Sequence, residues 1–325
     1  MKEGLIFANA RAKAKEQNLI SEERIKRMIE APSLNDAIRI LYEINYAGGM
    51  IAQGDDFYPI LEEEKRLVNK FVLEVAPEGI GLDCFFVKND YHNAKVFLKE
   101  RFGNITDAEG MLLGDGLINL PLLKEMVSSG KFEGNSFLQE AYERIENAFM
   151  KNIGSPRIVD LEIDKAMFKD ISLRLKKGVD QYIKKYFLIL TDATNILSFI
   201  RTIKIGGSYP FFEGYYVDGG SIPIDIFSKL GMDMDKLSRE LTGTEYKKLI
   251  ENAKGFDLSM YETALDNYLL TIFSEMKGDM FSAAPIVGYY LGKMNEIKII
   301  RVILVCLKNK VDKDEMKKRI RVIYA

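Results

Sequence analysis

The feature that most constrains the fold is a helix-like segment that occurs three times, at intervals of about one hundred residues. The copies are aligned on Asn93, Asn195 and Asn295. Four and five residues after each asparagine stand two apolar residues, followed by Lys or Arg: Phe97, Leu98 and Lys99; Phe199, Ile200 and Arg201; Ile299, Ile300 and Arg301. Because the apolar and charged positions coincide in all three copies, the same helix face is expected to meet a core each time. The spacing predicts three similar domains, residues 1–107, 108–208 and 209–325.

Two further motifs repeat in the same order. Leu113–Ile118 and Val217–Pro223 each combine glycine, aspartate and a returning apolar residue, which is typical of a tight turn into a new helix. Leu41–Tyr46 and Leu241–Tyr246 form another pair, with a looser copy at Met126–Phe132. Three motifs in one order favour triplication over coincidence.

Helical signals dominate the rest of the chain. Ser21 and Ser33 are suited to begin helices, and further helices are expected over 61–75 and 137–150. A long segment from Ile163 to Leu190 leads into the second copy, with a bend at Gly178. The residues after Val311 predict an amphipathic helix with a cationic face. The predicted fold class is all-α.

The two ends of the chain fall in the middle of the repeat. Phe7–Arg11 resembles an asparagine segment, whereas only residues 311–325 follow the last copy. Stacked repeats normally leave an exposed end. One solution is for three units to pack around a common axis, which would bring the first and last segments together.

Composition limits the function. There are 46 basic and 48 acidic residues, a net charge of −2, so the chain lacks the cationic field expected of a nucleic-acid-binding protein. No apolar run is long enough to span a membrane, and the first residues do not resemble a signal peptide, so a cytoplasmic protein is expected. Cys84 and Cys306 have no CxxC partner, and we expect them in cores.

Catalytic chemistry is poorly represented. His92 is the only histidine, and no nucleophile elbow, zinc-protease helix or phosphate-binding loop is present. The acidic runs Asp55–Asp56 and Glu62–Glu64 lack the spacing of a calcium loop and are interpreted as solvated. We therefore expect no catalytic residue, cofactor or metal.

Two groups of residues remain as candidates for a functional role. The repeated Asp90, Asn93, Asp192, Asn195 and Asn295 could contact a partner, but a mid-helix amide is tolerated mainly when something satisfies it, so a structural role is favoured. The aromatic segment contributes Tyr209, Phe211, Phe212, Tyr215 and Tyr216. Its rings would either dock a partner or fold back over the core, and both interpretations stay open.

These motifs together resemble the C subunit of the V-type and archaeal A-type rotary ATPases, whose eukaryotic counterpart is the d subunit. The resemblance is carried by residues spread over nearly the whole chain: Ala8–Ala12, Leu41–Tyr46 after Pro32–Leu34, Asp90–Asn93, Ile163–Asp164, Asp192–Asn195 and Gly219–Gly220. It implies three related helical domains around a pseudo-threefold axis, forming a funnel without a catalytic site. The third copy departs from the pattern, since Gly292 stands where the others have aspartate.

The resemblance implies a coupling role. The protein would seat a central shaft, built from the D and F subunits, on the membrane ring of proteolipid subunits, peripheral to the membrane, during ATP-linked transport of protons or sodium. Polar contacts are expected for the shaft and apolar or aromatic contacts for the ring. The alternative is an all-helical scaffold that binds other proteins in a groove; an enzyme with an unfamiliar helical active site would need convergent polar residues in a pocket.

Overall fold

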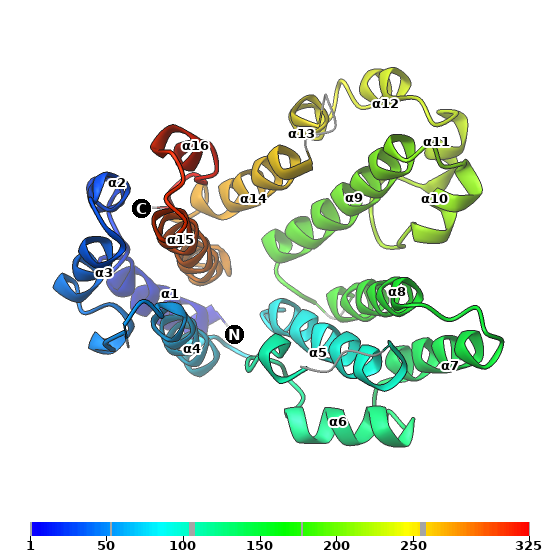
Figure 1. Ribbon diagram of the computed structural model, residues 1–325, viewed down its shortest axis with the longest axis horizontal. Coiled ribbons are helices and arrows are strands. Elements are labelled where there is room, and N and C mark those ends of the chain that lie inside the picture. Colours follow the sequence, from blue (N-terminus) through cyan, green and yellow to red (C-terminus); the bar gives the residue numbers. More distant parts are fainter. Residues whose placement is uncertain (1, 53, 104–107, 177, 254–257, 325) are drawn as a thin grey trace. The chain divides into compact units, whose positions relative to one another are not determined.

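Helices form the regular secondary structure of the part of the chain that the structure describes, and no β-strand occurs in that part. The structure is a computed structural model that describes residues 2–52, 54–103, 108–176, 178–253 and 258–324. It divides into two compact units (Figure 1). Unit 1 joins residues 1–80 to residues 262–325, and unit 2 comprises residues 81–261. The division into domains 1–107, 108–208 and 209–325 stays a prediction.

Unit 2 is one continuous stretch of chain. Its helices are α5 (Cys84–Gly103), the short 3₁₀ helix η2 (Glu109–Met111), α6 (Leu120–Ser129), α7 (Ser136–Met150), α8 (Pro156–Leu175), α9 (Gln181–Lys204), α10 (Tyr209–Tyr215), α11 (Ile224–Lys229), α12 (Met234–Glu240) and α13 (Lys247–Asn252). Helix α8 packs along α5 and α7, and α10 packs against α9.

Unit 1 is assembled from both ends of the sequence. Its helices are α1 (Lys2–Glu16), α2 (Glu22–Glu30), α3 (Leu34–Glu43), the 3₁₀ helix η1 (Tyr46–Gly49), α4 (Tyr58–Val75), most of α14 (Leu258–Ser274), α15 (Ala284–Lys308) and α16 (Lys313–Lys318). Helix α15 packs against both α1 and α4 (Figure 1). The first and last segments of the chain therefore meet, as the mid-motif ends of the sequence predicted.

Local sequence signals place the helix ends. The hydroxyls of Ser21 and Ser33 accept hydrogen bonds from Arg24 N and Asp36 N, so both predicted N-caps are confirmed. Gly178 has a φ of +79°, in the region that favours glycine, and the predicted long segment is divided there into α8 and α9.

The three asparagine segments lie on α5, α9 and α15, each at least 20 residues long. The apolar pair after each asparagine is buried, from Phe97 and Leu98 to Ile299 and Ile300. Each helix is apolar around much of its circumference because it packs against neighbours on more than one side.

The predicted amphipathic helix at the end of the chain was only partly correct. Helix α16 covers Lys313–Lys318 and buries Met316, but residues 319–324 are not helical. Arg321 contributes to an ion pair with Asp266 rather than to a cationic helix face. No helix in the described residues has the length and apolar character needed to cross a membrane.

Candidate functional site

The repeated asparagines clamp loops onto the long helices. The amide of Asn93 donates to Leu113 O at 2.8 Å and accepts from Leu113 N at 2.8 Å. Asn195 makes the same two-way contact with Val217, at 2.9 Å each way. A side-chain amide that pairs with a backbone amide in this way satisfies both groups in a buried site. We call the turns Leu113–Ile118 and Val217–Pro223 the glycine joints, and these contacts fix the start of each joint to its helix.

The other two asparagine segments make related contacts in unit 1. Asn295 donates to Val322 O at 2.6 Å. Asn9, in the N-terminal segment that resembles the repeat, donates to Met280 O and Ser282 O, both at 2.9 Å, and accepts from Ile286 N. Asn9 is fully buried. It therefore holds the loop that leads into α15.

The repeated aspartates receive backbone N–H groups of the glycine joints. Asp90 accepts from Ile118 N at 2.9 Å, and Asp192 accepts from Ser221 N and Ile222 N at 3.0 Å each. Burial raises the pKa of Asp90, while backbone hydrogen bonds from the joint act in the opposite direction. The carboxylates thus lie at the contact between a helix and the turn that follows it.

Glycine is required where each joint crosses its aspartate. A Cβ added to Gly116 would lie 2.2 Å from Asp90 Oδ1, and one added to Gly220 would lie 2.1 Å from Asp192 Oδ1. Tyr246, from the motif Leu241–Tyr246, donates its hydroxyl to Asp192 at 2.6 Å. The three repeated motifs of the sequence therefore meet at one place in the second copy.

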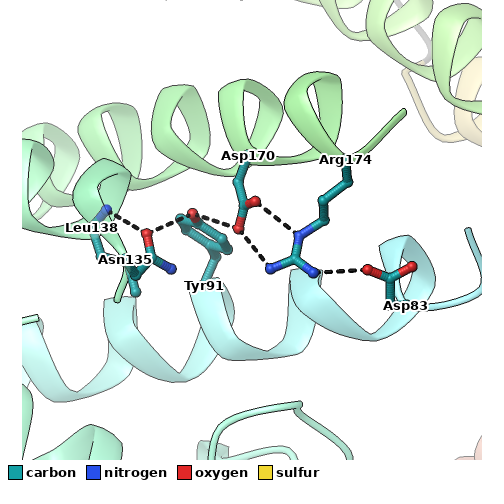
Figure 2. Close-up of polar contacts among 6 residues, drawn as sticks. All are labelled: Asp83, Tyr91, Asn135, Leu138, Asp170 and Arg174. Carbon is teal, nitrogen blue, oxygen red and sulfur yellow. Dashed lines mark hydrogen bonds and ion pairs between the residues drawn. The ribbon is translucent and has the colours of Figure 1, made fainter. Parts of the chain in front are cut away.

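A chain of polar contacts holds α5 against α8, both in unit 2 (Figure 2). The Tyr91 hydroxyl donates to Asp170 at 3.1 Å, and Arg174 bridges Asp170 and Asp83 at 2.8 and 2.7 Å. Asn135, within 3.4 Å of the Tyr91 hydroxyl, also caps α7. Desolvation lowers the pKa of Arg174, but the hydrogen bonds and charges of Asp170 and Asp83 outweigh it and raise this pKa above its ordinary value.

The same helix pair carries ion pairs further along. Lys95 lies 2.5 Å from Asp164, and Lys99 lies 2.6 Å from Asp160. As the residue number rises along α5, the number of its partner on α8 falls, as expected of antiparallel helices. The polar contacts and the buried apolar faces together fix the register of the pair, which resists sliding and twisting.

Unit 1 contains a buried group of charges that the sequence interpretation missed. Lys293 Nζ lies 2.7 Å from Glu64 and 2.7 Å from Glu296, and it donates to Asn18 O at 3.3 Å. Glu64 was interpreted as part of a solvated acidic run, but it is buried in α4. Its charged partner is 229 residues away in the sequence, so no local pattern could have indicated the pair.

The aromatic segment forms α10 and is divided between core and surface. Phe212 is fully buried between Phe199 and Phe227, with ring centroids 5.1 and 5.0 Å away. Tyr216 is half-buried and donates its hydroxyl to Ile222 O at 2.9 Å. Tyr209, also half-buried, lies beside Phe212.

Phe211 and Tyr215 contact an arginine at the start of α8. Their ring centroids lie 4.4 and 4.9 Å from Arg157 Cζ, and Arg157 also donates to the Tyr215 hydroxyl. Both rings are half-buried, and Arg157 is exposed. Large apolar side chains stand exposed nearby in the sequence, with Ile153 before Arg157 and Ile205 before α10. We call Arg157, Phe211 and Tyr215, which contact one another, the aromatic surface.

The remaining candidates have ordinary surroundings. His92 lies at the surface and its Nε2 is 2.9 Å from Met111 O. Cys84 and Cys306 are free and buried, and burial raises the pKa of Cys84 to about 12. Among the described residues, no three His, Cys, Asp or Glu side chains are grouped as metal ligands.

Comparison with known proteins decides the family. The family of ATP synthase (C/AC39) subunits matches residues 8–319. This chain belongs to that family. It is similar to the C subunit of the V-type sodium ATPase of Enterococcus hirae, with 23% identity over 97% of this chain and 98% of that protein.

Archaeal relatives give the same result. The C subunit of the A-type ATP synthase of Thermococcus onnurineus is 23% identical over 96% of this chain and 88% of its own length. That of Methanocaldococcus jannaschii is 22% identical over 92% of this chain and 81% of its own length. The resemblance of the sequence to the C subunits of these ATPases is therefore confirmed over nearly the full chain.

Proposed function

We propose that this chain is a non-catalytic central-stalk subunit of a V/A-type ATPase. It couples a rotating shaft of D and F subunits to the proteolipid ring during ATP-linked transport of protons or sodium. The observation that carries the proposal is the match of residues 8–319 to the ATP synthase (C/AC39) subunits, with near-complete coverage of both chains in the Enterococcus comparison. The protein works at the cytoplasmic surface of the membrane, held there by the complex.

The internal contacts suit a part that transmits torque. Long helices are fastened by buried amide clamps, by the Tyr91–Asp170–Arg174 chain and by the Lys293 charge group. Close-packed interiors deform little under load, and charge-assisted hydrogen bonds hold helix register. In the proposed arrangement, three related domains surround a pseudo-threefold axis and form a funnel for the shaft.

The aromatic surface is the proposed contact for the ring. Phe211, Tyr215 and Arg157 hold one another in place before binding, and the exposed Ile153 and Ile205, which precede α8 and α10 in the sequence, offer apolar area that a partner can bury. Aromatic residues and arginine are enriched at the energetic centres of protein interfaces, and preorganised side chains lose less entropy on binding.

The first experiment mixes the purified protein with its D–F complex and follows size-exclusion chromatography with light scattering. Co-elution as a one-to-one-to-one complex is expected. In parallel, the Phe211→Ala variant should lose binding to the purified proteolipid ring while it keeps binding to D–F. Tyr58→Ala, which also truncates a partly exposed ring, is the matched control and should bind both partners.

Two outcomes would contradict the proposal. If neither D–F nor the ring binds the folded protein at micromolar concentrations, the scaffold that binds other proteins becomes the better account. If Phe211→Ala weakens D–F binding and leaves ring binding unchanged, the aromatic surface has been assigned to the wrong partner.

A further inference from the structure

In the third copy of the repeat, a glycine replaces the aspartate, and an aromatic side chain packs closely against the helix at this position. Gly292 occupies the position of Asp90 and Asp192, so α15 has no carboxylate there. The ring of Tyr324 lies against this strip of the helix instead. A Cβ added to Gly292 would lie 2.7 Å from ring carbons of Tyr324, and one added to Gly288 would lie 2.4 Å from its hydroxyl oxygen. Only glycine at both positions leaves room for the ring.

Polar contacts fasten the residues before Tyr324. Arg321 Nε lies 2.7 Å from Asp266 on α14, and Val322 N donates to the side chain of Asn267 at 3.0 Å. Val322 O in turn accepts from Asn295 on α15, the repeated asparagine of the third copy. The segment therefore bridges α14 and α15 through both its backbone and its side chains.

The contacts extend to the first helix of the chain. The Tyr324 hydroxyl lies 3.4 Å from Glu16 Oε1 at the end of α1. Tyr324 is buried together with Leu19, which follows α1, and Leu270 on α14. One short non-helical segment thus contacts three helices of unit 1 that come from opposite ends of the sequence.

We propose that residues 321–324 form a releasable strap that locks unit 1 closed. In the first two copies a glycine joint is clamped by the repeated asparagine and lies over the aspartate. In the third, the strap is clamped by Asn295 and lies over Gly292. Its backbone has no helical hydrogen bonds of its own to break, so it can leave the glycine strip while α14 and α15 stay helical. Release uncovers the strip and removes contacts that hold α1 against α15.

Hydrogen exchange measured by mass spectrometry on the full chain tests the lock. Arg321→Ala and Tyr324→Ala should each speed exchange about tenfold in α1 and in residues 262–274, because these elements lose a shared contact. Arg319→Ala is the matched control, since this arginine is exposed and stands only two residues before Arg321 in the sequence. Exchange in α5 and α8 should not change in any variant.

Two results would overturn the lock. One is faster exchange confined to residues 313–324, which would make the strap a passive surface segment. The other is an equal effect of Arg319→Ala and Arg321→Ala. If Tyr324→Ala does not fold, Arg321→Ala still decides between these outcomes, because it loosens the strap at its ion pair with Asp266 and removes no buried aromatic side chain.

Binding in trans tests whether the strap is releasable. A synthetic peptide of residues 317–324, added in excess to Tyr324→Ala or Arg321→Ala, should restore slow exchange in α1. The same peptide carrying Tyr324→Ala should not. Failure of the unaltered peptide to restore slow exchange in a folded variant would contradict release. Neither readout involves the shaft or the ring, so failure here leaves the proposed function untouched.

Discussion

Lys293 Nζ lies at 2.7 Å from Glu64 on α4 and at the same distance from Glu296 on its own helix. One buried ammonium thus serves two buried carboxylates. Glu296 also accepts from Ile20 N at 2.6 Å, so the group ties the linker after α1 to α15. Glu64 lies in residues 1–80 and Lys293 in residues 262–325, so the group helps to specify how these two segments pack together in unit 1.

Removal of the ammonium should be costly. Lys293→Met leaves two buried carboxylates without their cation, and the expected loss of unfolding free energy is about 3–5 kcal/mol at neutral pH. The control is Lys298→Met on the same helix, whose side chain is 52% exposed, against 3% for Lys293, and pairs with Asp266. That change should cost about 1 kcal/mol or less. Similar losses for the two variants, measured by urea denaturation, would show that the buried group contributes no special stability.

The stability contributed by Glu296 should depend on pH. Burial raises the pKa of Glu296 above its ordinary 4.5, although Lys293 and Ile20 N act to lower it. Between pH 4.5 and this raised pKa, the folded state holds a proton that the unfolded state has lost, so rising pH removes stability. Relative to Glu296→Gln, the wild-type protein should therefore lose stability as pH rises through this window and show no trend below it. Denaturation of both proteins over a pH series measures the difference in their free energies of unfolding. A wild-type protein that gains stability relative to Glu296→Gln as pH rises would contradict the raised pKa.

Glycine at the joints should be irreplaceable where it crosses an aspartate. Gly116→Ala and Gly220→Ala place a Cβ against a buried carboxylate oxygen and should each cost about 1–3 kcal/mol. A Cβ at Gly114, in the same joint as Gly116, would meet nothing within 4 Å, so Gly114→Ala should stay within about 1 kcal/mol of the wild type. Thermal denaturation of the three variants ranks their stabilities. If Gly114→Ala loses as much stability as Gly116→Ala and Gly220→Ala, the close approach of the joint to the aspartate is not the cause of the loss.

The two aspartates should differ in importance. Asp192 accepts two backbone N–H groups and the hydroxyls of Ser221 and Tyr246, whereas Asp90 accepts from Ile118 N without a comparable pair of hydroxyls. An asparagine presents donors where the carboxylate accepted, so Asp192→Asn should lose about 2–3 kcal/mol and Asp90→Asn about 1 kcal/mol. Chemical denaturation midpoints provide the comparison, with the reverse order counting against the assigned contacts.

The aromatic segment should separate stability from binding. Phe212→Ala empties a fully buried site between Phe199 and Phe227 and should cost about 3–5 kcal/mol. Phe211→Ala removes a half-buried ring that contacts Arg157, and its effect on stability should be about 1 kcal/mol. Calorimetry distinguishes the two, and equal losses would place Phe211 in the core.

Short-range patterns were sufficient to predict much of the fold. Ser21 and Ser33 cap helices because each hydroxyl accepts a hydrogen bond from an N–H only three residues later, so the contact depends on local sequence alone. The asparagine register predicted which faces of α5, α9 and α15 are buried, since helical periodicity is written directly in the spacing.

Contacts between distant parts of the sequence could not be predicted in this way. Glu64 looked solvated beside Glu62 and Glu63, and only the packing of α15 on α4 supplies its partner, Lys293. Tyr324 gave no signal of its own, because its place depends on two glycines more than thirty residues earlier. Phe212 and Phe211 are neighbours in one aromatic run, yet the helix turns one inward and leaves the other at the surface.

The composition of unit 1 from residues 1–80 and 262–325 also determines when it can form during synthesis. Residues 81–261 are contiguous, so they can fold as soon as they leave the ribosome, and domains generally fold in the order of their emergence. Helices α1 to α4 must wait for α15, so their apolar faces stay open until residues 284–308 have been translated. During that interval, α1 to α4 are a segment of the nascent chain to which a chaperone is expected to bind.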